Sequence, residues 1–365
     1  MKQLHRPSDA YKNRDLARRV IEKIKEIAPK EPVKLCHVCG THEWTITHGG
    51  IRNLLPKTVE LIAGPGCPVC IVPAREIDEA VWLAENDVTV VTFGDMFRDP
   101  GSEKSLEDAK SKGADVRIIY SVRDLLDMAR KEPEREFVFF AIGFETTVPM
   151  NAVVIPESPK NLSYLISHRV IPPAMDFLLS LEDLNVNGFI APGHVSTIIG
   201  EKAYEKYPSE YGVPTVIAGF EPMDMLMGVY MLLKQLDEGK PQLENEYKRA
   251  VSYDGNLKAQ KIIDDTFEIV DGSWRGIGVI PDSTLQLREK YQDMDARVKY
   301  DIPIGPGRDI YPGCSCHLVI VGKINPDQCP LFNMACTPES PKGACMVSVE
   351  GTCRIWASHG GHEDL

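Results

Sequence analysis

Short apolar runs that end in loops of glycine, cysteine or small polar residues recur along this chain, and they restrict its fold more than any other feature. The runs span residues 33–38, 59–63, 88–93, 137–142, 188–191 and 215–218. Stretches with helical apolar periodicity separate several of them, at residues 77–84, 122–129 and 170–181. Buried strands that alternate with helices at this interval are typical of βαβ units on a parallel sheet. We therefore expect an α/β protein with two parallel-sheet domains.

The first two runs each continue into a cysteine loop. Residues 36–42 read Cys-His-Val-Cys-Gly-Thr-His, and residues 64–70 read Gly-Pro-Gly-Cys-Pro-Val-Cys. The carboxyl ends of neighbouring parallel strands meet at one edge of a sheet, which is where open α/β sheets bind ligands. Cys36 shares a strand face with Val38 and can belong to the core, whereas Cys39 falls at the turn. We expect both loops to open at one sheet edge, with Cys39 as the better candidate for a functional thiol.

Thiol chemistry and zinc binding both fit these loops. A thiolate at Cys39, oriented or deprotonated by His42 beside Thr41, could ligate a soft low-valent metal or attack an electrophile. The C-x-x-C pair at residues 67–70 could close to a disulfide. The alternative is a ribbon-like zinc site in which Cys36 joins the other three thiols. Polar groups such as Thr41 and His42 have no role in a closed zinc site, and they favour the reactive interpretation.

The cysteines are unevenly distributed. Of ten, four lie between residues 36 and 70, none between 71 and 313, and six between 314 and 353. The amino terminus lacks the apolar segment of a signal peptide, and no run approaches the ~18 apolar residues that span a bilayer, so we expect a cytoplasmic protein without a membrane segment. In a reducing cytosol, cysteines are more often metal ligands or redox groups than structural disulfides. The net charge of −12 argues against a nucleic-acid partner.

The carboxyl-terminal cysteines form a second sulfur group. They are Cys314, Cys316, Cys329, Cys336, Cys345 and Cys353. Gaps of 14, 6 and 16 residues separate Cys314, Cys329, Cys336 and Cys353. Such wide gaps suit an iron–sulfur cluster held by irregular loops, because zinc sites favour close cysteine pairs. Structural zinc and buried or disulfide-bonded cysteines are the alternatives, and Cys316 and Cys345 compete for the four ligand positions.

Polar residues follow two further strands, and the pattern of elements suggests domain boundaries. The polar residues are Glu145, Thr146 and Thr147 after one strand, and His194, Ser196 and Thr197 after another. His194 and Ser196 stand two apart on a turn without a G-x-S-x-G elbow, so a hydrolase triad is not indicated. We expect α/β domains at residues 1–115 and 116–237, and a cysteine-rich iron–sulfur domain at residues 238–365.

Five motifs in the same order together resemble the hydrogenase maturation factor family HypD. They are Cys39-Gly40-Thr41-His42, Gly64-Pro65-Gly66-Cys67-Pro68-Val69-Cys70, Gly143-Phe144-Glu145-Thr146-Thr147, Pro192-Gly193-His194-Val195-Ser196-Thr197 and the terminal Cys-x14-Cys-x6-Cys-x16-Cys. The resemblance implies a scaffold on which the Fe(CN)2CO group of [NiFe] hydrogenase is assembled before delivery to the hydrogenase large subunit. It also implies two α/β domains with a smaller cluster-bearing domain, a HypC-type chaperone and a HypE-type cyanide donor as partners.

The resemblance also assigns roles to individual residues. Cys39 would hold the iron with a cysteine of the chaperone, with Thr41 and His42 beside it, while Cys67 and Cys70 would exchange electrons. The ligands of a [4Fe-4S] cluster would be Cys314, Cys329, Cys336 and Cys353. Glu145, Thr146 and His194 belong to the matching motifs, and Cys36 lies outside them. Two other functions fit the same residues: an iron–sulfur disulfide reductase and a zinc-organised interaction module.

Overall fold

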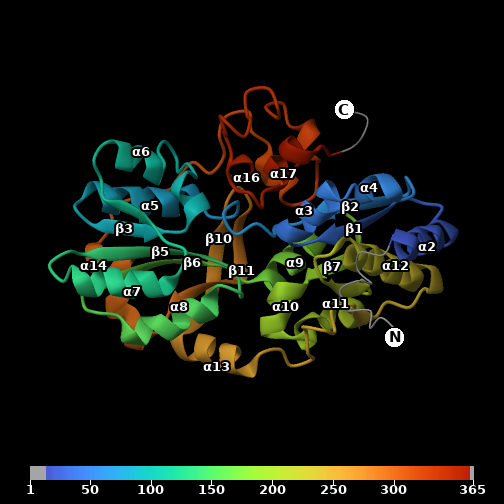
Figure 1. Cartoon of the computed structure of the whole chain (residues 1–365), viewed down its shortest axis with the longest axis horizontal. Coiled ribbons are helices and arrows are strands. Elements are labelled where there is room, and N and C mark those ends of the chain that lie inside the picture. The colour runs from blue at the N-terminus through green and yellow to red at the C-terminus, as the bar shows by residue number, and fades with distance from the viewer. Residues whose placement is uncertain (1–13, 362–365) are drawn as a thin grey trace, which may run out of the picture.

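The protein, described here by a computed structural model of residues 14–361, contains two parallel β-sheets (Figure 1). The first sheet has the strand order β2-β1-β7-β8-β9. Its strands are β1 (Val33–His37), β2 (Val59–Ala63), β7 (Val186–Pro192), β8 (Thr215–Ala218) and β9 (Leu243–Asn245). Each of these pairings is parallel. The amino-terminal segment on which we based the absence of a signal peptide lies outside the described residues.

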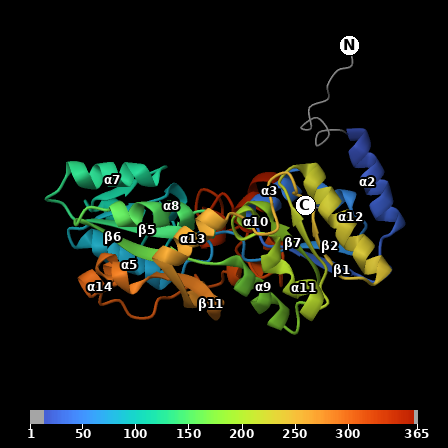
Figure 2. The ribbon, with the colours of Figure 1, turned by 90° about the horizontal axis from the view of Figure 1, so that it is seen from below.

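The second sheet has the order β4-β3-β5-β6 and is also parallel throughout. Its strands are β3 (Thr89–Thr92), β4 (Val116–Ile118), β5 (Phe137–Gly143) and β6 (Leu162–His168). Every residue of β5 and β6 is buried. Figure 2 shows why, because α7 (Val122–Lys131) and α8 (Val148–Val154) cover one face of this sheet and α5 (Ala74–Glu85) covers the other. The prediction of an α/β fold with parallel sheets is confirmed.

The helices pack their apolar faces on the sheets. Besides α5, α7 and α8, the structure contains the helices α2 (Arg14–Glu26), α3 (Gly40–His48), α9 (Ile171–Ser180), α10 (Gly193–Ile199) and α12 (Pro222–Glu238). In α7 the buried residues are Val122, Leu125, Leu126 and Ala129, at the i, i+3, i+4, i+7 spacing of an amphipathic helix. No described helix is both long and apolar enough to cross a bilayer.

The chain moves between the sheets and does not fill them in order. After β2 it enters the second sheet through α5, and α9 returns it to place β7 beside β1. The boundary expected at residue 115 therefore falls between β3 and β4, which pair within one sheet, while β7 and β8 belong to the first sheet. Buried parallel strands are continuously apolar in either sheet, so the apolar pattern of a strand does not predict which of the two sheets it joins.

The segment from residue 238 onward does not form one separate domain. Its first strand, β9, completes the first sheet. A hairpin of β10 (Phe267–Trp274) and β11 (Gly278–Leu287) packs beside β6, as does α14 (Ala296–Tyr300). From Cys314 onward the chain forms a cysteine-rich lobe with α15 (Cys316–Val319), α16 (Ala344–Val347) and α17 (Thr352–His359). Figure 1 shows this lobe above the junction of the two sheets.

Candidate functional site

The two cysteine loops lie against each other at one edge of the first sheet. β1 and β2 pair with His37 opposite Ala63, so both loops leave the same edge, as predicted. The Gly40 N–H donates to the Gly66 carbonyl at 3.2 Å. A Cβ atom at Gly66 would lie 2.1 Å from the backbone nitrogen of Cys39, so only glycine permits this approach. The second loop therefore supports the backbone of Cys39 directly.

Cys39 stands at the start of α3, with a histidine beside its sulfur. The residue is 3% exposed, and burial raises its pKa to about 12, although backbone hydrogen bonds from His42 and Thr41 oppose the shift. Its Sγ lies 3.8 Å from Nδ1 of His194, in the first turn of α10. Burial lowers the pKa of His194 to about 4. A neutral imidazole therefore faces a protonated thiol and can accept its hydrogen bond.

His42, which the sequence suggested as the histidine acting on Cys39, is turned toward another element. Its Nε2 lies 3.2 Å from the Ala218 carbonyl and 3.0 Å from the Gly219 carbonyl, at the end of β8. Burial lowers the pKa of His42 to about 3. Its Nδ1 has no hydrogen-bond partner among the described residues. His42 thus holds α3 against β8, and His194 is the histidine at the sulfur.

Cys67 and Cys70 form a disulfide beside the Cys39 loop. The Cys67 sulfur accepts a hydrogen bond from the Cys70 N–H at 3.2 Å. The Cys70 sulfur lies 3.9 Å from the carbonyl oxygen of Ala344. Ala344 precedes Cys345, so this disulfide borders the cysteine-rich lobe.

Cys36 differs in its surroundings from the three loop cysteines, Cys39, Cys67 and Cys70. It is fully buried on β1, and its sulfur would be 3.1 Å from a Cβ atom at Gly64. Burial raises the pKa of Cys36 far above its usual range. The ribbon-like zinc site requires Cys67 and Cys70 as separate thiolates, whereas here they are bonded to each other. Across residues 14–361, no group of three or more His, Cys, Asp or Glu is placed to hold a single metal ion.

An open cleft lies between the two sheets, and Cys39 stands directly behind its lining residues Thr41, Gly66 and His194. Its volume is about 660 Å³, which is in the usual range for small-molecule sites. Residues from three regions line it: Thr41, Gly66 and His194 from the first sheet, Asp95 and Thr146 from the second, and Glu350 from the cysteine-rich lobe. The polar residues predicted at separate strand ends, Thr41, Thr146 and His194, thus meet at one cavity. The described lining contains no lysine or arginine.

Glu145 is not among the residues that line this cleft. Its Oε1 accepts a hydrogen bond of 2.8 Å from the N–H of Ile171, the first residue of α9. Its Oε2 is buried without a partner among the described residues, and burial raises the pKa of Glu145 to about 7. Glu145 therefore ties the loop bearing Thr146 to the helix that carries the chain between the sheets.

Six cysteines surround one small cavity in the carboxyl-terminal lobe. They are Cys314, Cys316, Cys329, Cys336, Cys345 and Cys353, and all are buried. Backbone N–H groups point at their sulfurs: Ser315 donates to Cys329 at 3.4 Å and Lys342 donates to Cys336 at 3.3 Å. Thiols from separate loops around one cavity, with amides directed at sulfur, suit an iron–sulfur cluster. Cys316 and Cys345 line the same cavity, so the choice of four ligands stays a prediction.

A buried ionic network that sequence reasoning missed joins α3 to this lobe. The Glu43 carboxylate accepts two hydrogen bonds from Arg52, at 2.9 and 2.7 Å, and lies 2.8 Å from His37 Nε2. It also accepts from the indole N–H of Trp356 on α17 at 2.8 Å. Burial raises the pKa of Glu43, but the Arg52 guanidinium and His37 outweigh burial and hold it well below its usual range. In the sequence, the only sign of this network was that a glutamate, Glu43, directly follows His42.

Comparison with known proteins gives full-length matches. A family model described as HypD, hydrogenase formation hypA family, matches residues 15–360. A hydrogenase expression/formation protein of Methanocaldococcus jannaschii is 47% identical over 349 residues, covering 94% of this chain and 97% of the relative. Hydrogenase maturation factor HypD2 of Bradyrhizobium diazoefficiens is 43% identical over 371 residues, covering 98% and 97%. Hydrogenase maturation factor HypD of Azotobacter vinelandii is 41% identical over 365 residues, covering 96% of each.

Proposed function

The chain belongs to the HypD hydrogenase formation family, and from this premise we propose that it is the scaffold on which the Fe(CN)2CO group of [NiFe] hydrogenase is assembled. Cys39 holds the iron, as cargo, together with a cysteine of a HypC-type chaperone. A HypE-type protein donates cyanide, and the finished group passes to the hydrogenase large subunit. The observation that carries the proposal is the position of Cys39, behind Thr41, Gly66 and His194 at an open cleft.

The environment of Cys39 suits a thiol that ionises only when metal arrives. A soft thiolate retains low-spin ferrous iron and leaves coordination positions free for cyanide and carbon monoxide. Because burial raises the pKa of Cys39 to about 12, the thiolate forms as iron displaces the proton. His194 Nδ1 is placed to accept that proton. Since burial lowers the pKa of His194 to about 4, the proton does not stay there at pH 7 and leaves through the cleft.

The disulfide is the proposed electron store beside the iron. Reduction of Cys67–Cys70 to two thiols takes up two electrons and two protons. On reoxidation the two electrons go to the cyano group that the HypE-type donor delivers: its bond to the donor breaks, cyanide passes to the iron, the donor atom takes up one proton, and the second proton goes to solvent. A [4Fe-4S] cluster held by Cys314, Cys329, Cys336 and Cys353 would supply these electrons one at a time from an external low-potential donor. The 3.9 Å contact between the Cys70 sulfur and Ala344, next to cavity-lining Cys345, supports this route.

Infrared spectroscopy of the anaerobically copurified complex with the chaperone tests the iron ligand. The wild-type complex should show cyanide and carbonyl bands, and Cys39→Ala should lose them. Cys36→Ala is the matched control, because Cys36 is a buried thiol three residues away whose sulfur lies 3.9 Å from the His37 carbonyl, whereas the Cys39 sulfur lies 3.8 Å from His194 at the cleft. It should keep the bands. Bands that persist in Cys39→Ala would remove this residue from the iron ligands.

A disulfide reductase is the second candidate, and the disulfide beside the six-cysteine cavity favours it. This function predicts steady turnover of a disulfide substrate with an electron donor, at a rate that depends on Cys67 and Cys70. The scaffold predicts tight partner binding and transfer of at most a few electrons. Counting electrons consumed per protein molecule, with and without a disulfide substrate, separates the two.

A further inference from the structure

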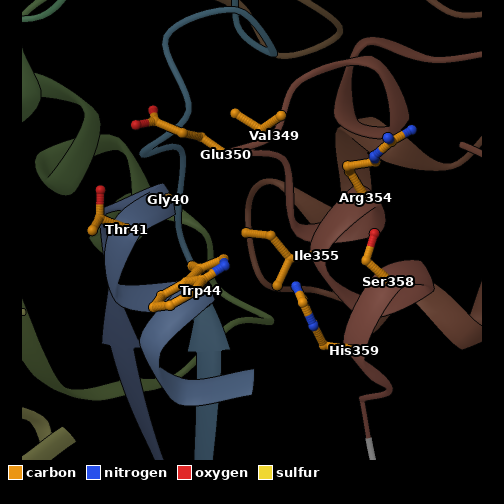
Figure 3. A pocket seen from close by; sticks show the side chains of 9 residues that line it. All are labelled: Gly40, Thr41, Trp44, Val349, Glu350, Arg354, Ile355, Ser358 and His359. Carbon is orange, nitrogen blue, oxygen red and sulfur yellow. The ribbon is translucent and has the colours of Figure 1, made fainter. Parts of the chain in front are cut away.

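A second hollow lies on the outer side of α3, between this helix and α17 (Figure 3). Its volume is about 410 Å³, enough for one or two side chains. Trp44 of α3 forms one wall, and Arg354, Ser358 and His359 of α17 form the other. The lining between them includes Gly40 and Ile355. Nothing in the assembly chemistry at Cys39 uses this hollow.

Trp44 is both exposed and held in place. It is 43% exposed, which is unusual for so large an apolar side chain. Its ring stacks on His48, one turn along α3, with centroids 4.5 Å apart and planes 9° apart. His359 meets the edges of both rings, at 6.4 Å from Trp44 and 5.2 Å from His48. An aromatic side chain fixed in this way loses little conformational entropy when a partner covers it.

Arg354 supplies the charge of the hollow. Within the described chain its guanidinium donates to the Pro338 carbonyl at 2.8 Å and pairs with no carboxylate. Glu350 also lines the hollow, but Figure 3 shows its carboxylate pointing away from His359, to the side where Thr41 stands. A ligand in the hollow therefore meets an aromatic ring, a buried aliphatic residue and a cation.

The hollow adjoins the cleft in front of the Cys39 loop. Thr41, Val349 and Glu350 line both cavities. Cys39 is nearly buried, so a protein that brings a second thiolate to it must insert a segment into the cleft and rest its remaining surface on a lip. This lip carries an exposed tryptophan and an arginine, the residue types that dominate interface hot spots.

We propose that the hollow anchors the small protein that supplies the second iron-binding thiolate, and that it takes an apolar side chain with a carboxylate beside it. The apolar side chain packs on Trp44 and Ile355, and the carboxylate pairs with Arg354. This inference rests on the proposed function, which requires such a partner. The anchor contributes affinity and orientation, while Cys39 contributes the metal bond.

Binding measurements between the anaerobically purified full chain and its HypC-type chaperone, both without iron, test the anchor. Trp44→Ala should weaken the complex about 30-fold, and Arg354→Gln about tenfold with a smaller dependence on salt. Trp44→Phe keeps a ring and should retain most of the affinity. Tyr211→Ala is the matched control, because Tyr211 is also half-exposed at 50% but lines neither cavity. It should bind as the wild type does.

The outcomes separate the anchor from the function on which it rests. Full affinity in both Trp44→Ala and Arg354→Gln overturns the anchor and leaves the scaffold intact. A wild-type chain that does not bind the chaperone contradicts the scaffold, and the anchor with it. A dimer of this chain that dissociates in Trp44→Ala assigns the hollow to a second copy and also overturns the proposal. Should Trp44→Ala lower the melting temperature, Arg354→Gln decides, since Arg354 is partly exposed and its hydrogen bond is to a backbone carbonyl.

Discussion

The fold presents its two groups of cysteines in opposite ways. Cys39, Cys67 and Cys70 stand on loops at the ends of two paired strands, beside an open cleft and a histidine. The six carboxyl-terminal cysteines come from irregular loops and surround a small cavity, where backbone amides point at several sulfurs. One arrangement leaves room for incoming ligands, and the other encloses a small space. Chemically similar cysteines are therefore suited either to exchange or to retention of a metal group by their surroundings.

The two regions are also joined mechanically. The Cys70 sulfur touches the backbone of α16, and Glu43 binds the indole of Trp356 on α17. Ser348 and Val349 hydrogen-bond to Asp95, which lines the cleft from the second sheet. The open cleft in front of Cys39 and the enclosed six-cysteine cavity are therefore connected through only a few residues.

Removing one cysteine from each region tests directly whether the two groups of cysteines have different roles. Cys336→Ser should lose most of the iron, the sulfide and the visible absorption, because an iron–sulfur cluster needs its full set of thiolates. Cys39→Ser should keep all three. The melting temperature should fall more in Cys336→Ser, since the binding energy of a structural metal group is also folding energy. Iron, sulfide and zinc quantification on anaerobic protein is the measurement.

Two results would count against the division. Equal loss of iron and sulfide in both variants would mean that the two groups of cysteines hold one metal centre. Zinc in place of iron, in protein without colour, would support a zinc-organised module and contradict the cluster.

Glu43 tests how strongly the two regions depend on each other. Glu43→Gln leaves Arg52 and His37 buried without their shared carboxylate, and breaking such a pair costs about 3 to 5 kcal/mol. We expect that loss in the free energy of unfolding at pH 7, measured with urea. Because α3 and α17 then separate more easily, the infrared cyanide and carbonyl bands of the iron group at Cys39 should also weaken.

The effect of Glu43 depends on pH with a definite sign. Arg52 and His37 outweigh burial and depress its pKa below the ordinary value of 4.5. A depressed carboxyl pKa stabilises the folded state fully above the unfolded pKa, and this stability is lost as the pH falls below about 4.5. Glu43→Gln should therefore flatten the acid side of the stability profile. Parallel profiles for the two proteins would show that folding does not lower the pKa of Glu43.

The sequence predicted local elements better than their partners. The apolar runs located β1, β2, β3, β5, β7 and β8, because buried parallel strands are continuously apolar. β6 was missed, since Ser163 and Ser167 interrupt its run. The loop of Cys39 was predicted, but the histidine at its sulfur lies 155 positions away, and the indole that binds Glu43 lies 313 positions away. Spacing within a motif does not encode contacts of that range.

A substitution at Gly66 should disturb only the backbone next to Cys39, and it is the mildest of these changes. A Cβ atom there would lie 2.1 Å from the Cys39 backbone, and such overpacking costs about 1 to 3 kcal/mol. Gly305→Ala is the matched control, since nothing lies within 4 Å of the added carbon. Gly66→Ala should weaken the cyanide and carbonyl bands while the iron and sulfide of the cysteine-rich lobe stay at wild-type levels. Loss of iron from the cysteine-rich lobe as well would contradict this prediction. It would mean that a shift of the Cys39 loop is transmitted to the six-cysteine cavity, so that the two sites are structurally coupled.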